Sequence, residues 1–203
     1  DSFRRGKPST HIKYGEASAV LAGSSLLTLA FEIITDKKYK ISLKSKNEIV
    51  SSLAKCSGHT GIAGGQELDL KFENKNKKLN QIIDMQKKKT GKLFYFCLYA
   101  VGIVANKNKK QKILLGNLGE EIGLLFQLAD DFLDIKGSKK LVGKPVKKDN
   151  KKGKSTLLNL MGYKKAYMYA LKLKKKILRK LKKHGKKAKE LTNTIEFILE
   201  RNF

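Results

Sequence analysis

A stripe of carboxylates in an otherwise apolar segment constrains this sequence more than any other feature. Polar residues in the segment from Phe126 to Asp134 recur at the spacing of one helix face, and they are Gln127, Asp130, Asp131 and Asp134. The remaining faces of the same helix are apolar, so we expect it to be mostly buried. Buried carboxylates repel one another and lose hydration, at a cost of several kcal/mol per unpaired ion, so a cation must face them.

Two kinds of cation would satisfy this stripe. Lysines of a neighbouring helix would form an internal ion-pair network with it. Alternatively, Asp130 and Asp134 lie one helical turn apart, so their oxygens can converge on a hard divalent ion such as Mg²⁺, whose coordination substrate phosphates often complete. The stripe alone does not choose between these interpretations.

Composition bounds the class of protein. With 203 residues, of which 40% are hydrophobic, the chain can bury one core and is expected to be a single domain. The formal net charge is +27, which raises an anionic membrane or a nucleic acid as a partner. Nearly all the cations are lysines, however, and they are spread along the chain without a nucleic-acid-binding module. We therefore expect a solvated lysine surface and no specific nucleic-acid ligand.

The most apolar window covers residues 17–31 and is expected to be a core helix, because 15 uncharged residues are short for a membrane span. Cys56 and Cys97 lie in apolar segments without metal-ligand spacing, which is typical of buried free thiols. We predict a cytoplasmic protein with no transmembrane segment. The expected packing face of the core helix consists of Ala17, Val20, Leu21, Leu27 and Phe31.

Helical periodicity predicts an all-α chain with long helices and no strand. Ser45 and Glu48 have the S-x-x-E spacing of a capping box, Thr90-Gly91 interrupts one helix, and Gly185 is expected to end another. A loop is expected over residues 136–153. The predicted helices cover residues 13–35, 45–62, 79–104, 112–135, 155–183 and 187–201.

Three short motifs place cations beside residues that interrupt regular structure. The segment from Arg4 to Pro8 is by itself commonly a basic loop, although Arg forks also bind phosphate oxygens bidentately. Lys89-Thr90-Gly91 is either a simple kink or a site that brings together an ammonium, a hydroxyl and free carbonyls. The loop that carries Lys144 and Lys154 follows the acidic stripe, and it is not a P-loop because Lys148 stands where that motif requires glycine.

Seven motifs in this order resemble the trans-isoprenyl diphosphate synthases, with the closest likeness to bacterial farnesyl diphosphate synthases. They are RRGKP, HxKYGEAxAxLAG, GGQxxDL, KTG, FQxxDDxxD, GKPxxKD and GKST, and they extend from Arg4 over the whole chain. The resemblance implies an isoprenoid-synthase helical bundle with a central cavity. It also implies that residues 1–203 form one polyprenyl synthase domain that lacks the family's N-terminal helices and first aspartate-rich motif.

The resemblance implies roles for particular residues. Lys89, Thr90 and Gln127 would be the catalytic group beside an allylic cation, and would also contact the substrate. Asp130, Asp131 and Asp134 would bind Mg²⁺, or Mn²⁺ in its place. No role follows for Gln66, Asp69 or His11. The residues that would bind the two diphosphates are Arg4, Arg5, Lys89, Lys144 and Lys154.

The implied reaction condenses an allylic diphosphate, dimethylallyl or geranyl, with isopentenyl diphosphate to give farnesyl diphosphate and pyrophosphate. The resemblance also implies a homodimer, and an inactive fragment, because only half of the metal site is present. Geranylgeranyl or longer-chain synthases stay open, since the residues that set product length lie outside this sequence. A non-catalytic subunit of a heteromeric synthase is a further alternative, against which the intact aspartates argue.

Overall fold

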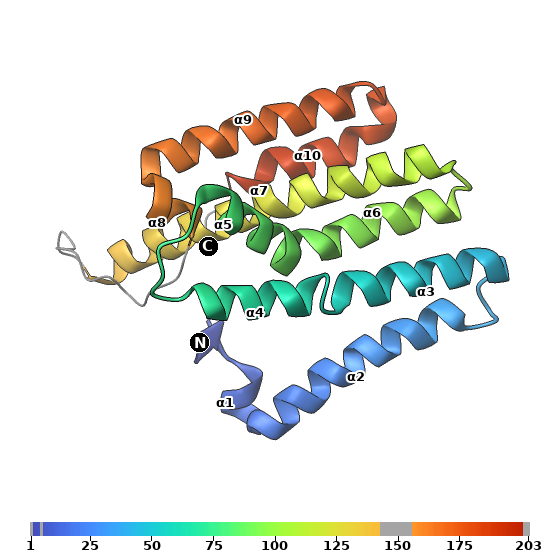
Figure 1. The fold of residues 1–203 in the computed structure, drawn as a ribbon, viewed down its shortest axis with the longest axis horizontal. Coiled ribbons are helices and arrows are strands. Elements are labelled where there is room, and N and C mark those ends of the chain that lie inside the picture. Colours follow the sequence, from blue (N-terminus) through green and yellow to red (C-terminus); the bar gives the residue numbers. More distant parts are fainter. Residues whose placement is uncertain (1, 5, 143–155, 201–203) are drawn as a thin grey trace. The chain divides into compact units, whose positions relative to one another are not determined.

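Helices make up most of the described residues in the computed structural model, which confirms the predicted all-α class (Figure 1). The structure describes residues 2–4, 6–142 and 156–200, without the side chains of Arg4 and of residues 136–142. The chain divides into two compact units, residues 1–51 and residues 52–202, with the boundary inside one helix, α3 (Leu43–Ser57).

The first unit begins with a short antiparallel hairpin. Strand β1 (Phe3–Arg4) pairs with β2 (Lys7–Pro8), so the prediction that the chain has no strand is wrong here. Gly6 allows the tight turn because its φ of 73° lies in the left-handed region that other residues rarely adopt. The predicted helix over residues 13–35 is two helices, α1 (Thr10–Tyr14) and α2 (Glu16–Thr35), which are separated at Gly15.

Helix α2 has no buried residue. Most of the packing face expected for a core helix is exposed, with 68% of Val20 and 66% of Leu21 accessible, while Phe31 is partly buried. By length and composition, α2 is also the one helix among the described residues that could cross a membrane, with a mean hydropathy of 1.7. Signal sequences and core helices of soluble proteins share these properties, so they do not define a membrane segment.

Helix α3 begins at Leu43, and the predicted capping box of Ser45 and Glu48 is wrong. The hydroxyl of Ser42 accepts a hydrogen bond of 3.2 Å from the Ser45 amide, so Ser42 occupies the capping position one turn earlier. The buried Lys46 donates to the carbonyls of Thr35 and Asp36 at the end of α2. A cation at a helix C-terminus is favourable.

The second unit contains the remaining helices. Helix α7 continues past the predicted end at Ile135 to Val142, so residues 136–142 are helical rather than a loop. The predicted helix over residues 155–183 is interrupted at Gly162, whose φ is 77°. Gly185 separates two helical segments, as predicted. The elements are α4 (Ile62–Phe72), α5 (Leu79–Gln86), the π-helical turn η1 (Lys87–Gly91), α6 (Lys92–Val104), α7 (Lys109–Val142), α8 (Leu157–Met161), α9 (Tyr163–Lys182), the 3₁₀ helix η2 (Gly185–Ala188) and α10 (Lys189–Ile198).

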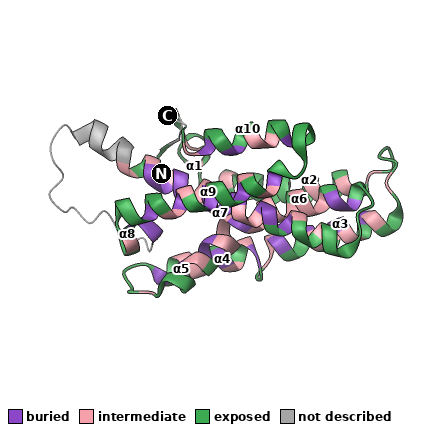
Figure 2. Cartoon of the chain, turned by 90° about the horizontal axis from the view of Figure 1, so that it is seen from above, coloured by how far each residue is buried: buried purple, intermediate pink, exposed green. Residues whose placement is uncertain are grey.

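The core of the second unit surrounds α7, which packs against α6 and α9 (Figures 1 and 2). Residues 122–135 are mostly buried, as the inverted polarity of this segment predicts. Cys56 is buried, but the expectation is wrong for Cys97, which is exposed on α6. The largest fully buried side chains are those of Ile82, Met85, Leu125, Leu128, Leu157, Ile177 and Ile195.

Glycines allow α6 and α7 to approach each other closely. A Cβ atom added at Gly119 would lie 2.2 Å from the Phe94 carbonyl oxygen, and one at Gly123 would lie 2.7 Å from the Cα of Gly91. Gly116, one turn before Gly119, lies in the same way against the ring of Tyr95. The α6–α7 contact therefore depends on one glycine face of α7.

Candidate active site

The interruption predicted at Thr90-Gly91 is the π-helical turn η1. Its sequence gives it little intrinsic support, because three adjacent lysines repel one another and glycine disfavours helix. Each lysine pairs instead with a carboxylate from a different helix. The pairs are Lys87 with Glu120 of α7 at 3.4 Å, Lys88 with Asp84 of α5 at 2.9 Å, and Lys89 with Asp69 of α4.

Helix α4 contacts both the backbone and the side chain of Lys89. A Cβ atom at Gly65 would lie 2.2 Å from the Lys89 amide nitrogen, so glycine is required at this contact. Asp69, one helical turn later, forms the ion pair with the Lys89 ammonium. The GGQxxDL motif, whose Asp69 had no role in the sequence-based prediction, thus holds Lys89, while Gln66 is exposed.

A chain of hydrogen bonds connects η1 to the acidic stripe. The Thr90 hydroxyl donates to Oε1 of Gln127 at 2.8 Å, and Nε2 of Gln127 donates to Asp131 Oδ1 at 2.9 Å. Gln86, the last residue of α5, donates to Asp131 Oδ2 at 3.3 Å. The structure therefore brings together Lys89, Thr90, Gln127 and Asp131, which the sequence places in two separate motifs, KTG and FQxxDDxxD.

The carboxylates of the stripe differ in their surroundings. Asp131 is buried, Asp130 is partly buried and Asp134 is exposed. Burial raises the pKa of Asp131 to about 6; the amides of Gln127 and Gln86 lower it, and the neighbouring carboxylates of Asp134 and Asp130 raise it. The side-chain amides of Gln86 and Gln127, which donate to Asp131, are neutral groups and not lysines.

The chemistry of this position fits a divalent cation. Oε1 of the buried Gln86 has no hydrogen-bond partner among the described residues, and it belongs to the same amide that donates to Asp131. An unpaired acceptor beside a carboxylate of raised pKa marks a place that lacks positive charge, and carboxylate oxygens are ligands that Mg²⁺ prefers. Within the described ranges, no three His, Cys, Asp or Glu residues cluster closely enough to hold a metal, so ligation by Asp130, Asp131 and Asp134 stays a prediction.

Several predicted substrate-binding residues lie outside the described part of the structure. Arg5, Lys144 and Lys154 belong to undescribed segments, and for Arg4 only the backbone is described, in β1. Their roles stay predictions from the sequence.

Two residues of the site escaped the sequence-based prediction. Gln86 is buried, with 3% of its surface exposed. The sequence feature that could have indicated it is a polar residue directly after the apolar helix face of Ile82 and Met85. Glu120 is partly buried between two lysines, and the sequence offers only an unremarkable acidic pair, Glu120-Glu121, as its signal.

Comparison with known proteins identifies the family to which the chain is related. Residues 1–195 match the polyprenyl synthetase family. The chain is 39% identical to the farnesyl diphosphate synthase of Bacillus subtilis over 168 residues, which are 81% of this chain and 57% of that protein. The chain spans between 55% and 62% of the length of three such bacterial synthases.

Solved structures agree with this relationship. An FPP/GFPP synthase from Zymomonas mobilis in its apo form has a TM-score of 0.83 and 36% identity, and the match covers 98% of this chain and 66% of that one. A geranyltransferase from Helicobacter pylori, in a complex with magnesium and isoprenyl diphosphate, has a TM-score of 0.79 and 29% identity over 98% of this chain and 65% of that one. The fold is that of the all-α isoprenoid synthases. The chain belongs to the polyprenyl synthetase family.

Proposed function

We propose that this protein is a prenyltransferase that condenses an allylic diphosphate with isopentenyl diphosphate to give farnesyl diphosphate and pyrophosphate. One observation carries the proposal: in a chain of this family, the π turn that bears Lys89 and Thr90 is hydrogen-bonded through Gln127 to the buried carboxylate of Asp131. An ammonium, an oriented hydroxyl and an acidic stripe are thus held within one constellation. The similarity to several bacterial farnesyl diphosphate synthases supports this choice of product.

In the proposed reaction, the bond between the allylic carbon and the diphosphate oxygen breaks, and a carbon–carbon bond forms to the isopentenyl double bond. A proton then leaves the new product, and the released pyrophosphate accepts it. The Lys89 ammonium stabilises charge on the departing oxygens, together with Arg4, Lys144 and Lys154, while Arg5 binds isopentenyl diphosphate. The oxygen of Thr90 and the backbone carbonyl of Lys89 face the allylic cation, and Gln127 lies beside it.

Asp130, Asp131 and Asp134 are the proposed ligands of Mg²⁺, or of Mn²⁺ in its place. A bound divalent ion would supply positive charge at the leaving diphosphate. The magnesium in the H. pylori geranyltransferase structure supports the choice of metal.

The proposal is tested by incubating the protein, as its gene encodes it, with dimethylallyl and isopentenyl diphosphates and measuring the chain length of the products. We expect mainly the C15 diphosphate. A dominant C20 or longer product would favour the alternative of a geranylgeranyl or longer-chain synthase, and the name of the Z. mobilis FPP/GFPP synthase shows that products vary within this fold. No product at all would favour a non-catalytic subunit of a heteromeric synthase.

Replacing a proposed metal ligand separates catalysis from folding. Asp130→Ala should reduce turnover by roughly 100-fold or more, because removal of a catalytic group costs several kcal/mol of transition-state stabilisation. Circular dichroism should show an unchanged helix content. Lys172→Ala, which changes an exposed residue of α9, is the control and should retain turnover. Near-normal rates of Asp130→Ala would contradict the metal assignment.

The remaining expectations belong to this proposal. Residues 1–203 are expected to form one polyprenyl synthase domain and to show no synthase activity by themselves, which the short coverage of the relatives supports. Prenyl transfer by this 203-residue chain would contradict that statement. We also propose a cytoplasmic homodimer without a transmembrane segment, which analytical ultracentrifugation and cell fractionation would test.

A further inference from the structure

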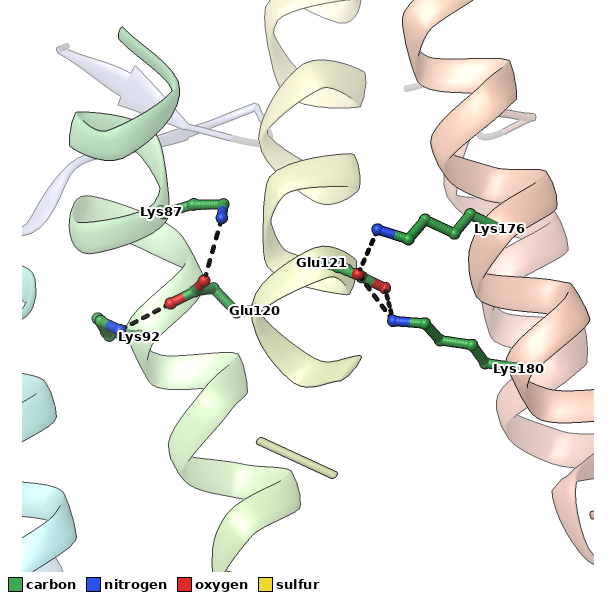
Figure 3. Close-up of polar contacts among 6 residues, drawn as sticks. All are labelled: Lys87, Lys92, Glu120, Glu121, Lys176 and Lys180. Atoms are coloured by element: carbon green, nitrogen blue, oxygen red, sulfur yellow. Dashed lines mark hydrogen bonds and ion pairs between the residues drawn. The ribbon is translucent and has the colours of Figure 1, made fainter. Parts of the chain in front are cut away.

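Two adjacent glutamates of α7 face opposite sides of the helix (Figure 3). Glu120 points toward η1 and α6, where its carboxylate pairs with Lys87 at 3.4 Å and with Lys92 at 2.7 Å. Glu121 points toward α9 and pairs with Lys176 at 2.9 Å and Lys180 at 2.7 Å. Each glutamate side chain is 16% exposed, so the two residues differ mainly in the helices to which their lysine partners belong.

The partners of Glu120 have a particular place in the sequence. Lys87 is the first residue of the π turn, and Lys92 is the first residue after it. One carboxylate therefore bridges both ends of the turn that carries Lys89 and Thr90. The α7 backbone also lies against this turn, because a Cβ atom at Gly91 would lie 3.3 Å from the Glu120 carbonyl oxygen.

Successive turns of α7 continue this contact toward the proposed site. Gly123 lies against Gly91, Gln127 accepts from Thr90, and Asp131 accepts from Gln86 just before the π turn. Together with Glu120, these residues stand at i, i+3, i+7 and i+11 of α7, which is one helix face. A π turn makes i→i+5 hydrogen bonds in place of the α-helical ones and occurs rarely, so outside contacts are needed to fix where it forms.

We propose that Glu120 is a positioning residue, which fixes the π turn on α7 so that Lys89 and Thr90 meet Gln127 and Asp131. The catalytic consequence rests on the proposed prenyl transfer, whereas the positioning itself is a property of the folded chain. Because the ion pairs of Glu120 are with Lys87 and Lys92 and not with Lys89 or Thr90, it acts on the latter two through the geometry of η1.

Glu120→Gln and Glu121→Gln form a matched pair for the test, since both remove one partly buried carboxylate that bridges two lysines. Amide hydrogen exchange is measured by mass spectrometry on peptides that cover residues 87–93. We expect Glu120→Gln to accelerate exchange there by about tenfold, the factor that loss of one hydrogen bond to a charged group gives. Glu121→Gln should leave this peptide unchanged while lowering thermal stability to a similar extent.

Activity provides the second readout. In the proposed synthase assay, Glu120→Gln should lower kcat by about tenfold more than Glu121→Gln with little change in the KM for isopentenyl diphosphate, and Glu120→Asp should recover part of the loss. Equal exchange at residues 87–93 in both variants would overturn the inference, whatever the assay shows. If Glu120→Gln fails to fold, Lys92→Gln removes the same 2.7 Å ion pair from the other side and is judged by the same exchange criterion. If Glu120→Gln accelerates exchange at residues 87–93 but the wild-type protein has no synthase activity, only the proposed function is rejected and the positioning role stands.

Discussion

At the scale of single residues, identical chemistry has different consequences on the two sides of α7. Glu120 and Glu121 each bind two lysines, yet the first stabilises a turn of the candidate site and the second fastens α9 to α7. Burial raises the pKa of Glu121, but hydrogen bonds from Lys180 and Lys176 outweigh it, so the pKa lies below the ordinary value of 4.5. Its ionised form is therefore favoured by folding.

This shift predicts how the contribution of Glu121 depends on pH. Because the folded-state pKa is depressed, the stabilisation is complete above about pH 4.5 and is lost as the pH falls through the folded-state pKa. Urea unfolding of the wild type and of Glu121→Gln should give a free-energy difference that is constant at neutral pH and shrinks below pH 4.5. A difference that stays constant down to pH 3 would show that the lysine pairs contribute nothing through charge.

At the scale of elements, the glycine face of α7 determines how closely α6 can lie. Gly119→Ala should destabilise the protein by about 1–3 kcal/mol, the usual cost of overpacking, because its Cβ would meet the Phe94 carbonyl at 2.2 Å. Gly23→Ala is the control: it lies inside α2 with no atom within 4 Å of the added Cβ, and helix propensity alone should stabilise it by roughly 1 kcal/mol. Chemical denaturation of both variants measures these changes, and equal effects would refute the close-packing explanation.

The sequence was sufficient to predict those parts of the elements that local periodicity determines. The buried face of α7, the interruption at Thr90-Gly91 and the end of α9 near Gly185 follow from spacing and propensity, and the structure contains them. The exposure of α2 was not predictable, since an apolar window does not reveal what packs on it. Capping by Ser42 was missed because a second serine, Ser45, stands at an equally plausible spacing.

The candidate site shows the same division. Lys89, Thr90, Gln127 and Asp131 belong to motifs, so the sequence named them, and the structure adds the bonds between them. The proposed function of Glu120 depends on its contacts with both ends of a π turn in another segment. The spacing of residues within α7 carries no information about those contacts, so the sequence does not predict this residue.

At the scale of the whole molecule, the net charge of +27 is the dominant property. Excess like charge destabilises a compact state by self-repulsion, and salt screens that repulsion over about 10 Å at 0.1 M. We therefore expect the melting temperature to rise by about 3 °C between low salt and 0.3 M NaCl, the shift that roughly 1 kcal/mol gives in a chain of this size.

The control for this prediction is Lys172→Glu, at an exposed position of α9, which should raise the melting temperature in low salt and reduce its salt dependence. A melting temperature that falls as NaCl is added would mean that the ion pairs of α7 outweigh the general repulsion.

The π turn also limits which lengths of chain this fold tolerates. Each residue of an α-helix advances the helix by about 100°, so the loss of one residue between Gln86 and Lys92 would rotate all of α6 relative to α5 by that angle. Phe94 and Tyr95 would then leave the glycines of α7, and Thr90 would leave Gln127. Insertions and deletions should therefore be selected against in these few residues. A single chain length places α6 against the glycines of α7 and, at the same time, Thr90 against Gln127.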